Sequence, residues 1–211
     1  MIVYGNSLSP FVRKTLAFAA EKGQAVELVN AGFGAGPPEF QQASPFGKMP
    51  GFKDGDFLIS DSTAVITYLE AVKPDPNLIP ADPKARARTV WYEEFADTIL
   101  VAAMGQIFFN LVVAPKFLKQ PGDLAAIEAG KAQLPKLFDY VESVAPASGF
   151  LVEDRITLAD IAVASPFQNL ALAGCGITAA GHPKAAKYVQ AILERPSYAG
   201  MVAKERAMFG L

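Results

Sequence analysis

The sequence predicts an α/β unit at the N-terminus followed by an all-α half. Residues 1–73 carry strand, helix and hairpin patterns in turn, whereas every long segment of residues 84–211 repeats its apolar residues at the period of a helix. Residues 74–83 between them hold prolines at four positions, which is typical of a linker. We therefore expect two domains joined by this linker.

The first unit begins with a short apolar strand at 2–4 and a helix that starts beside a proline. Ser9 is the expected N-cap, because its hydroxyl can accept a hydrogen bond from the first turn, and Pro10 fits the first helical position. A second strand is expected at 25–29. The right-handed rule for such crossovers makes it parallel to the first strand.

A glycine- and proline-rich loop at 32–38 and a weakly patterned segment precede a predicted hairpin. Its strands are expected at 49–53 and 57–60. Asp54 and Gly55 tolerate the positive φ angles of a type I′ turn, so we place the turn on these two residues.

The hairpin leads into a helix start that has the properties of an anion site. Asp61 and Ser62 precede an apolar helical stripe, and the first N–H groups of a helix attract a carboxylate. Pro50 follows Met49 where a cis peptide bond could turn the Met49 backbone toward an extended peptide, although an edge-strand proline also explains it. Together these residues outline a peptide-binding site.

The second half predicts helices separated by turn signals. Ile156 and the sequence Thr157 to Asp160 predict a helix start with a capping box and a hydrophobic staple. The apolar run 99–114 carries Gln106 and is shorter than the roughly 18 residues of a membrane span, so we interpret it as a buried helix. The helical segments are expected at 83–114, 124–144, 158–173 and 183–194.

Composition excludes several classes of function. The chain has 19 basic and 21 acidic residues without a basic patch, which gives no indication of nucleic-acid binding. Cys175 is the only cysteine and His182 the only histidine, so a disulfide framework, a Ser-His-Asp hydrolase and a zinc or other metal site are not expected. The N-terminus lacks the features of a signal peptide, and we expect a cytoplasmic protein without membrane association.

The order of motifs along the chain carries a resemblance to a known family. SPFVRK opens the first helix, GKMP, the hairpin and DS follow, and the helical half contains ITLADIAVAS. In this order and spacing the chain resembles the cytosolic glutathione transferases, in particular serine-type bacterial members. The resemblance implies a thioredoxin-like first domain that binds glutathione, a helical second domain that lines a hydrophobic substrate pocket, and a homodimer with a role in detoxification.

The resemblance also implies which residues bind glutathione. The Met49 backbone would pair with the cysteinyl moiety, with Pro50 cis. Asp61 would bind the γ-glutamyl ammonium and Ser62 its carboxylate. Lys48 would reach the glycyl carboxylate, although a solvated lysine beside a turn explains it too. Family members usually carry Glu where Asp61 stands, so in this chain the ammonium contact would come from a shorter side chain.

Three residues are candidates for contact with the glutathione sulfur. Ser9 directly precedes Pro10, as in one serine-type group, and ranks first. The sequence NSLSP also resembles a bacterial group whose active-site cysteine would fall on Asn6 and whose neighbouring serine would fall on Ser7. Ser7 therefore ranks second and Asn6 third. Helix capping also explains Ser9, and turn chemistry explains the other two.

The electrophile pocket is harder to predict, because aromatic residues at helical spacing usually pack in a core. Phe11, Phe108 and Phe109 are the candidates. Asp97, on the helix expected from Pro83, matches a position at which the resemblance implies an acid that reaches a ligand across the dimer, but a cap partner or a solvated residue is the preferred interpretation. The function predicted is attack of the glutathione thiolate on a small hydrophobic electrophile, or reduction of a hydroperoxide. The alternative is a non-catalytic binding or scaffolding protein that keeps the fold.

Overall fold

The N-terminal unit of the computed structural model, which describes residues 1–32 and 35–211, is built on one mixed sheet. Its strands lie in the order β2-β1-β3-β4. β1 and β2 are parallel, as predicted, and the hairpin strands β3 and β4 run antiparallel to their neighbours. The strands are β1 Ile2–Gly5, β2 Glu27–Asn30, β3 Gly51–Asp54 and β4 Phe57–Ser60.

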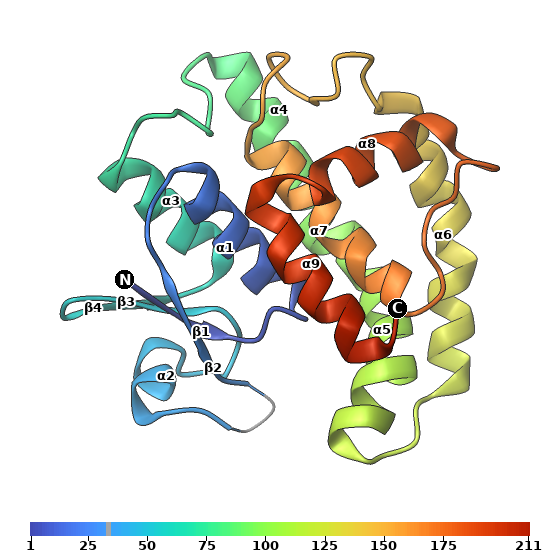
Figure 1. Cartoon of the computed structure of the whole chain (residues 1–211), viewed down its shortest axis with the longest axis horizontal. Coiled ribbons are helices and arrows are strands. Elements are labelled where there is room, and N and C mark those ends of the chain that lie inside the picture. The colour runs from blue at the N-terminus through green and yellow to red at the C-terminus, as the bar shows by residue number, and fades with distance from the viewer. Residues whose placement is uncertain (33–34) are drawn as a thin grey trace.

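Helices cover both faces of this sheet (Figure 1). α1 (Pro10–Glu21) and α3 (Ser62–Val72) pack together on one face, and α2 (Pro38–Ala43) lies on the other. Val12 and Phe18 of α1 and Leu69 of α3 are fully buried between the sheet and the helical half. Of the loop predicted at 32–38, residues 33 and 34 lie outside the described part of the chain.

The hairpin turn lies one residue later than predicted. Asp54 pairs with Phe57 across the ladder, so Gly55 and Asp56 are the two turn residues. Only Gly55 has a positive φ, 61°. A type I′ turn needs positive φ at both central residues, whereas a glycine at the first position fits type II′.

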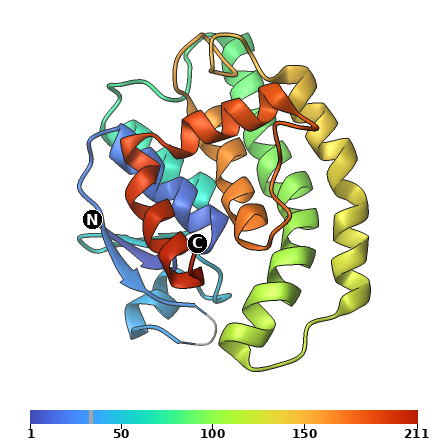
Figure 2. The same ribbon diagram turned by 45° about the vertical axis from the view of Figure 1, so that its right-hand side comes forward.

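The C-terminal half is all helical in the part that the structure describes, with α7 at its centre (Figure 2). Each residue of α7 except Ala171 is buried, because α7 packs against α1, α4, α5 and α8. The long helix that begins at Pro83 and α6 run side by side along one flank. The elements are α4 Pro83–Glu94, η1 Phe95–Leu100, α5 Val101–Phe108, η2 Phe109–Leu118, α6 Leu124–Val144, α7 Leu158–Leu172, α8 Pro183–Leu193 and α9 Pro196–Phe209.

Two helices differ from the prediction. The helix that begins at Pro83 runs past Pro115 to Leu118, because η2, which contains Pro115, is π-helical and its wider turn accommodates a proline that cannot donate a backbone hydrogen bond. α9 was not among the predicted helices. Its sequence mixes polar and apolar residues on every side, and its buried residues include the charged Glu205.

The helix from Pro83 to Leu118 is long and apolar enough to cross a membrane by length and composition. The length argument made from the sequence was therefore incorrect. Within its most apolar window 44% of the residues are buried in the protein, and Leu100, Met104 and Ile107 belong to the main core. One helix of this kind is weak support for a membrane span, since core helices have the same composition.

A buried arginine joins the two halves of the chain. Arg13 of α1 is fully buried and pairs with Glu205 of α9, with Nη2 to Oε2 at 3.0 Å. Its Nη1 donates to the backbone carbonyl of Ser165 at 2.7 Å and to Oδ1 of Asn169 at 2.9 Å on α7. Asn169 in turn donates to the Leu8 carbonyl at 2.7 Å, just before α1. These bonds fix the position of the first helix on the helical half.

Candidate functional site

Two adjoining cavities lie beside the start of α1, the first lined by the sheet unit alone and the second by both halves of the chain. The first, which we call the polar cavity, has a volume of about 290 Å³. The second, the apolar cleft, has a volume of about 450 Å³. Phe11, Lys48 and Met49 line both, so the two form one continuous site. The polar cavity is also lined by Ser44, Phe46, Ser60, Asp61 and Ser62.

The start of α3 forms one wall of the polar cavity. Asp61 is the N-cap, and its Oδ1 accepts hydrogen bonds from the N–H groups of Thr63 at 2.9 Å and Ala64 at 3.1 Å. Ser62 is the first residue of the helix and is only 3% exposed. The residue expected to bind an ammonium group therefore also caps the helix, which leaves one carboxylate oxygen, Oδ2, for a cation beside a helix N-terminus that favours an anion.

The loop before β3 forms the opposite wall. The Met49–Pro50 peptide bond is cis, as the resemblance implied. The hydroxyl of Ser44 donates to the Lys48 carbonyl at 2.7 Å and holds this loop in place. Gly32, with a φ of 112°, packs so closely on Met49 that an added Cβ would lie 2.3 Å from its sulfur. The Lys48 side chain is exposed at the edge of the cavity.

The apolar cleft lies between the start of α1 and the inner face of α5. The three aromatic residues predicted for the pocket, Phe11, Phe108 and Phe109, all line it. The prediction did not include the other lining residues of the helical half. Most of these repeat with the helical period of α5 and the turn after it, so an explicit assignment of that face would have found them. They are Val101, Met104, Gly105, Val113 and Asn169.

The three candidates for contact with a thiol lie in different surroundings. Ser9 lines the apolar cleft and caps α1, with its Oγ 3.5 Å from the Val12 N–H. The Asn6 side chain is engaged elsewhere, since it donates to Asn30 Oδ1 at 3.1 Å and accepts from the Leu8 N–H at 2.9 Å. Ser7 is half-buried and lines neither the polar cavity nor the apolar cleft in the described part of the chain.

A buried charge cluster lies behind the start of α3. Lys14 of α1 is 1% exposed and pairs with two carboxylates, Glu93 at 2.9 Å and Asp97 at 2.5 Å. Thr63 in the first turn of α3 donates its hydroxyl to Glu93 Oε1 at 2.9 Å. Asp97 is thus an ion-pair partner rather than the cap partner or solvated residue expected from the sequence. Burial raises its pKa to about 6, against the lowering effect of Lys14.

This cluster predicts a pH-dependent stability that Asp97→Asn removes. Because the folded pKa of about 6 lies above the ordinary value of 3.8, the folded state holds a proton that the unfolded state releases between these values. The contribution of Asp97 to stability therefore falls as pH rises through this window. Two pKa units correspond to an upper limit of about 2–3 kcal/mol. In urea unfolding, the free energy of unfolding of Asp97→Asn relative to the wild type should therefore increase from pH 4 to 6.5.

Asp56→Asn in the exposed hairpin turn is the matched control and should follow the wild type at every pH. The pKa of Asp160 is also raised to about 6 by burial, but this group is present in all three proteins and cancels in the differences. Parallel curves for Asp97→Asn and the wild type would contradict the prediction.

The N-terminal unit is a four-stranded mixed sheet with helices on both faces, which is the thioredoxin-like class of fold. It is joined to a helical domain, and the two-part site lies beside the start of α1. Two family models match the chain, "Glutathione S-transferase, N-terminal domain" over residues 3–77 and "Glutathione S-transferase, C-terminal domain" over residues 100–196. The chain belongs to the glutathione S-transferase family.

Two plant relatives and one bacterial structure match most of the length of the chain. It is 30% identical over 210 residues to "Glutathione S-transferase 3" of Zea mays, covering 95% of this chain and 92% of the relative. A glutathione S-transferase of Hyoscyamus muticus is 32% identical over 167 residues, 76% of this chain and 78% of the relative. The crystal structure of a glutathione S-transferase from Rhodospirillum rubrum F11 superposes with a TM-score of 0.84 at 25% identity, covering 93% and 89% of the two chains.

Proposed function

We propose that this protein is a serine-type glutathione transferase that binds glutathione in the polar cavity and a hydrophobic electrophile in the apolar cleft. The observation that carries the proposal is the continuity of the two cavities. The helix start at Asp61 and Ser62, the Met49 loop and the cleft beside Ser9 border one site, in the order in which the γ-glutamyl, cysteinyl and sulfur parts of glutathione follow one another.

In this proposal the γ-glutamyl group lies at the start of α3. Its carboxylate accepts hydrogen bonds from the Ser62 hydroxyl and a helix N-terminal amide, and its ammonium lies beside the second carboxylate oxygen of Asp61. The Met49 backbone pairs with the cysteinyl part, and Lys48 neutralises the glycyl carboxylate. The Thr63 bond to Glu93 supports this arrangement, because it holds the first turn of α3 against the helical half.

The sulfur then lies at the mouth of the apolar cleft beside Ser9. The thiol releases its proton to solvent, and the Ser9 hydroxyl stabilises the thiolate by donating a hydrogen bond. The thiolate attacks an electrophilic carbon, a carbon–sulfur bond forms, and the leaving group departs or the acceptor is protonated. With a hydroperoxide the thiolate attacks one peroxide oxygen instead, the O–O bond breaks and the other oxygen leaves as an alcohol after protonation by water. The glutathione sulfenic acid that forms then reacts with a second glutathione to give glutathione disulfide and water. Phe11, Phe108 and Phe109 supply the apolar surface for the electrophile.

The remaining parts of the proposal concern the organisation of the protein. We assign residues 1–73 to the glutathione domain and 84–211 to the helical domain, and we place the protein in the cytoplasm of a bacterium. A homodimer is proposed in which the first domain of one subunit contacts the helical domain of the other. Phe46, 90% exposed on the first domain, and Trp91, 50% exposed on α4, supply apolar surface for such a contact.

Glutathione titration of the wild type and of Ser62→Ala tests the proposed cavity. A hydrogen bond to a charged group contributes about 1.5–3 kcal/mol, so loss of the Ser62 hydroxyl should weaken glutathione binding by about tenfold or more in calorimetry. Ser143→Ala, an exposed serine on α6, is the control and should bind as the wild type does. A wild type that shows no saturable binding at millimolar glutathione would overturn the proposal.

A further inference from the structure

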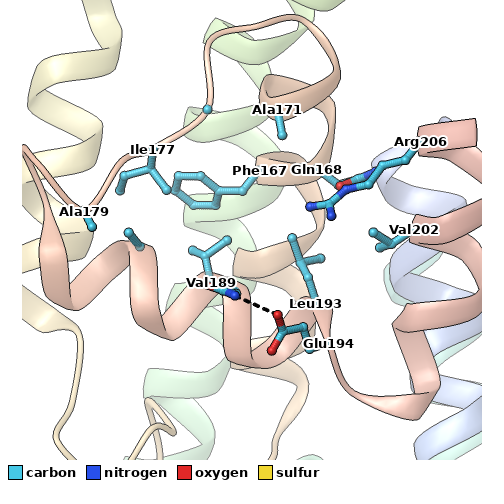
Figure 3. Close-up of a pocket in the computed structure, with 13 residues that line it drawn as sticks. Phe167, Gln168, Ala171, Ile177, Ala179, Val189, Leu193, Glu194, Val202 and Arg206 are labelled. Atoms are coloured by element: carbon cyan, nitrogen blue, oxygen red, sulfur yellow. Dashed lines mark hydrogen bonds between the residues drawn. The ribbon is translucent and has the colours of Figure 1, made fainter. Parts of the chain in front are cut away.

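A third cavity lies in the helical domain between α7, α8 and α9. Its volume is about 310 Å³, and no residue that lines it lines the polar cavity or the apolar cleft. Helix α7 supplies one wall, α8 the floor and α9 the end (Figure 3). This cavity is therefore independent of the proposed glutathione chemistry.

A buried glutamine without partners faces this cavity. Gln168 of α7 is 0% exposed, and neither its Nε2 nor its Oε1 has a hydrogen-bond partner in the described part of the chain. An unsatisfied carboxamide is costly in a protein interior, where an apolar residue of similar size would pack better. Such a group indicates a ligand or a water that completes its hydrogen bonds.

An arginine at the end of the cavity carries an unneutralised charge. Arg206 of α9 lines the cavity and makes no ion pair or hydrogen bond through its side chain with any residue that the structure describes. Figure 3 shows its guanidinium group reaching toward Gln168. The carboxylate of Glu194, the acidic residue of the lining, instead accepts a hydrogen bond from Gln190 Nε2 at 2.7 Å. The positive charge is therefore available to a ligand.

The rest of the lining is largely apolar and comes from all three helices and the segment before α8. A carboxylate head group suits the Arg206 fork and the Gln168 amide donor, and a short hydrocarbon suits the remaining wall. The volume is at the lower end of the range for small-molecule sites, about 300–1,000 Å³, which favours a small ligand. The apolar wall consists of Phe167, Ile177, Val189, Leu193 and Val202.

We propose that this cavity binds a small amphipathic carboxylate, with the carboxylate paired to Arg206 and hydrogen-bonded to Gln168 and the hydrocarbon against the apolar wall. Binding does not require glutathione, so the proposal stands or fails separately from the transferase proposal. It assigns a second ligand site to the helical domain.

A calorimetric titration with octanoate, in the presence of saturating glutathione, tests the proposal. The wild type should bind one octanoate per chain saturably at or below millimolar concentration. Arg206→Gln should weaken binding at least tenfold. Lys204→Gln is the matched control, because it removes the same charge from the same helix but lines a different surface, and its affinity should stay within twofold of the wild type.

Gln168→Leu separates a binding role from a purely structural one. It removes the unsatisfied carboxamide, so the variant should melt no lower than the wild type and yet bind octanoate several-fold more weakly. Absence of saturable binding to the wild type, or equal weakening by Arg206→Gln and Lys204→Gln, would overturn the proposal. The cavity would then be a space filled by water and not a ligand site.

Discussion

Arg13→Met should lower the free energy of unfolding by about 3–5 kcal/mol, the range measured when one partner of a buried ion pair is removed. The substitution keeps much of the side-chain volume but leaves Glu205, which is 1% exposed, as a buried charge without its partner. It also removes the donor to Ser165 and Asn169. Urea unfolding at pH 7 measures the loss.

A double variant distinguishes loss of the pair from loss of packing. Arg13→Met with Glu205→Leu replaces both charges by apolar side chains and should recover most of the lost stability, because well-packed apolar residues often replace a buried pair at little cost. If the double variant is as unstable as Arg13→Met, the bonds to α7 rather than the buried charge of Glu205 account for the effect.

Arg195→Gln is the matched control, since it breaks a second arginine–glutamate pair that joins α1 to the beginning of α9. Arg195 is paired with Glu21 at 2.7 Å, but its side chain is 29% exposed. Solvent screens such a pair, and an exposed or partly exposed ion pair contributes about 1 kcal/mol or less. We therefore expect a loss several times smaller than that of Arg13→Met.

Ser9→Ala should raise the pKa of the bound glutathione thiol by about one unit or more and reduce transferase activity at neutral pH by about threefold or more, because less of the thiol is ionised. Lowering a thiol pKa by about two units requires about 2.7 kcal/mol of preference for the thiolate. One charge-assisted hydrogen bond contributes about 1.5–3 kcal/mol, and the N-terminus of α1 adds about 0.3–1 kcal/mol. Thiolate absorbance as a function of pH, together with the pH profile of kcat/KM, measures both effects.

The capping role of Ser9 requires its own control. Removing an N-cap hydroxyl costs about 0.5–2 kcal/mol of stability, so activity is compared at a temperature where all variants are folded. Ser9→Thr keeps the hydroxyl and should retain most of the activity. Ser7→Ala and Asn6→Ala should leave the thiol pKa unchanged. A pKa that rises with Ser7→Ala or Asn6→Ala, and not with Ser9→Ala, would move the role to that residue.

Local signals in the sequence are sufficient for much of the fold. The capping box of Thr157 and Asp160 forms as predicted, as does the N-cap of Ser9, because both depend on residues within one helical turn. The hairpin was predicted, yet its turn was misplaced by one residue. Asp54 and Gly55 suit a turn in isolation, whereas the pairing of β3 with both β1 and β4 sets the register.

The sequence by itself determined the fold class and pointed to some of the residues that line the two-part site, because helix starts, turns and the Met-Pro step are local features of the chain. Only the tertiary structure decided that Asp97 is a partner of Lys14, that α9 packs on α1 through Arg13 and Glu205, and that Gln168 and Arg206 face one cavity. The physical reason is the same in each case. These contacts join residues far apart in the sequence, and packing of one helix on another selects them without a local signal.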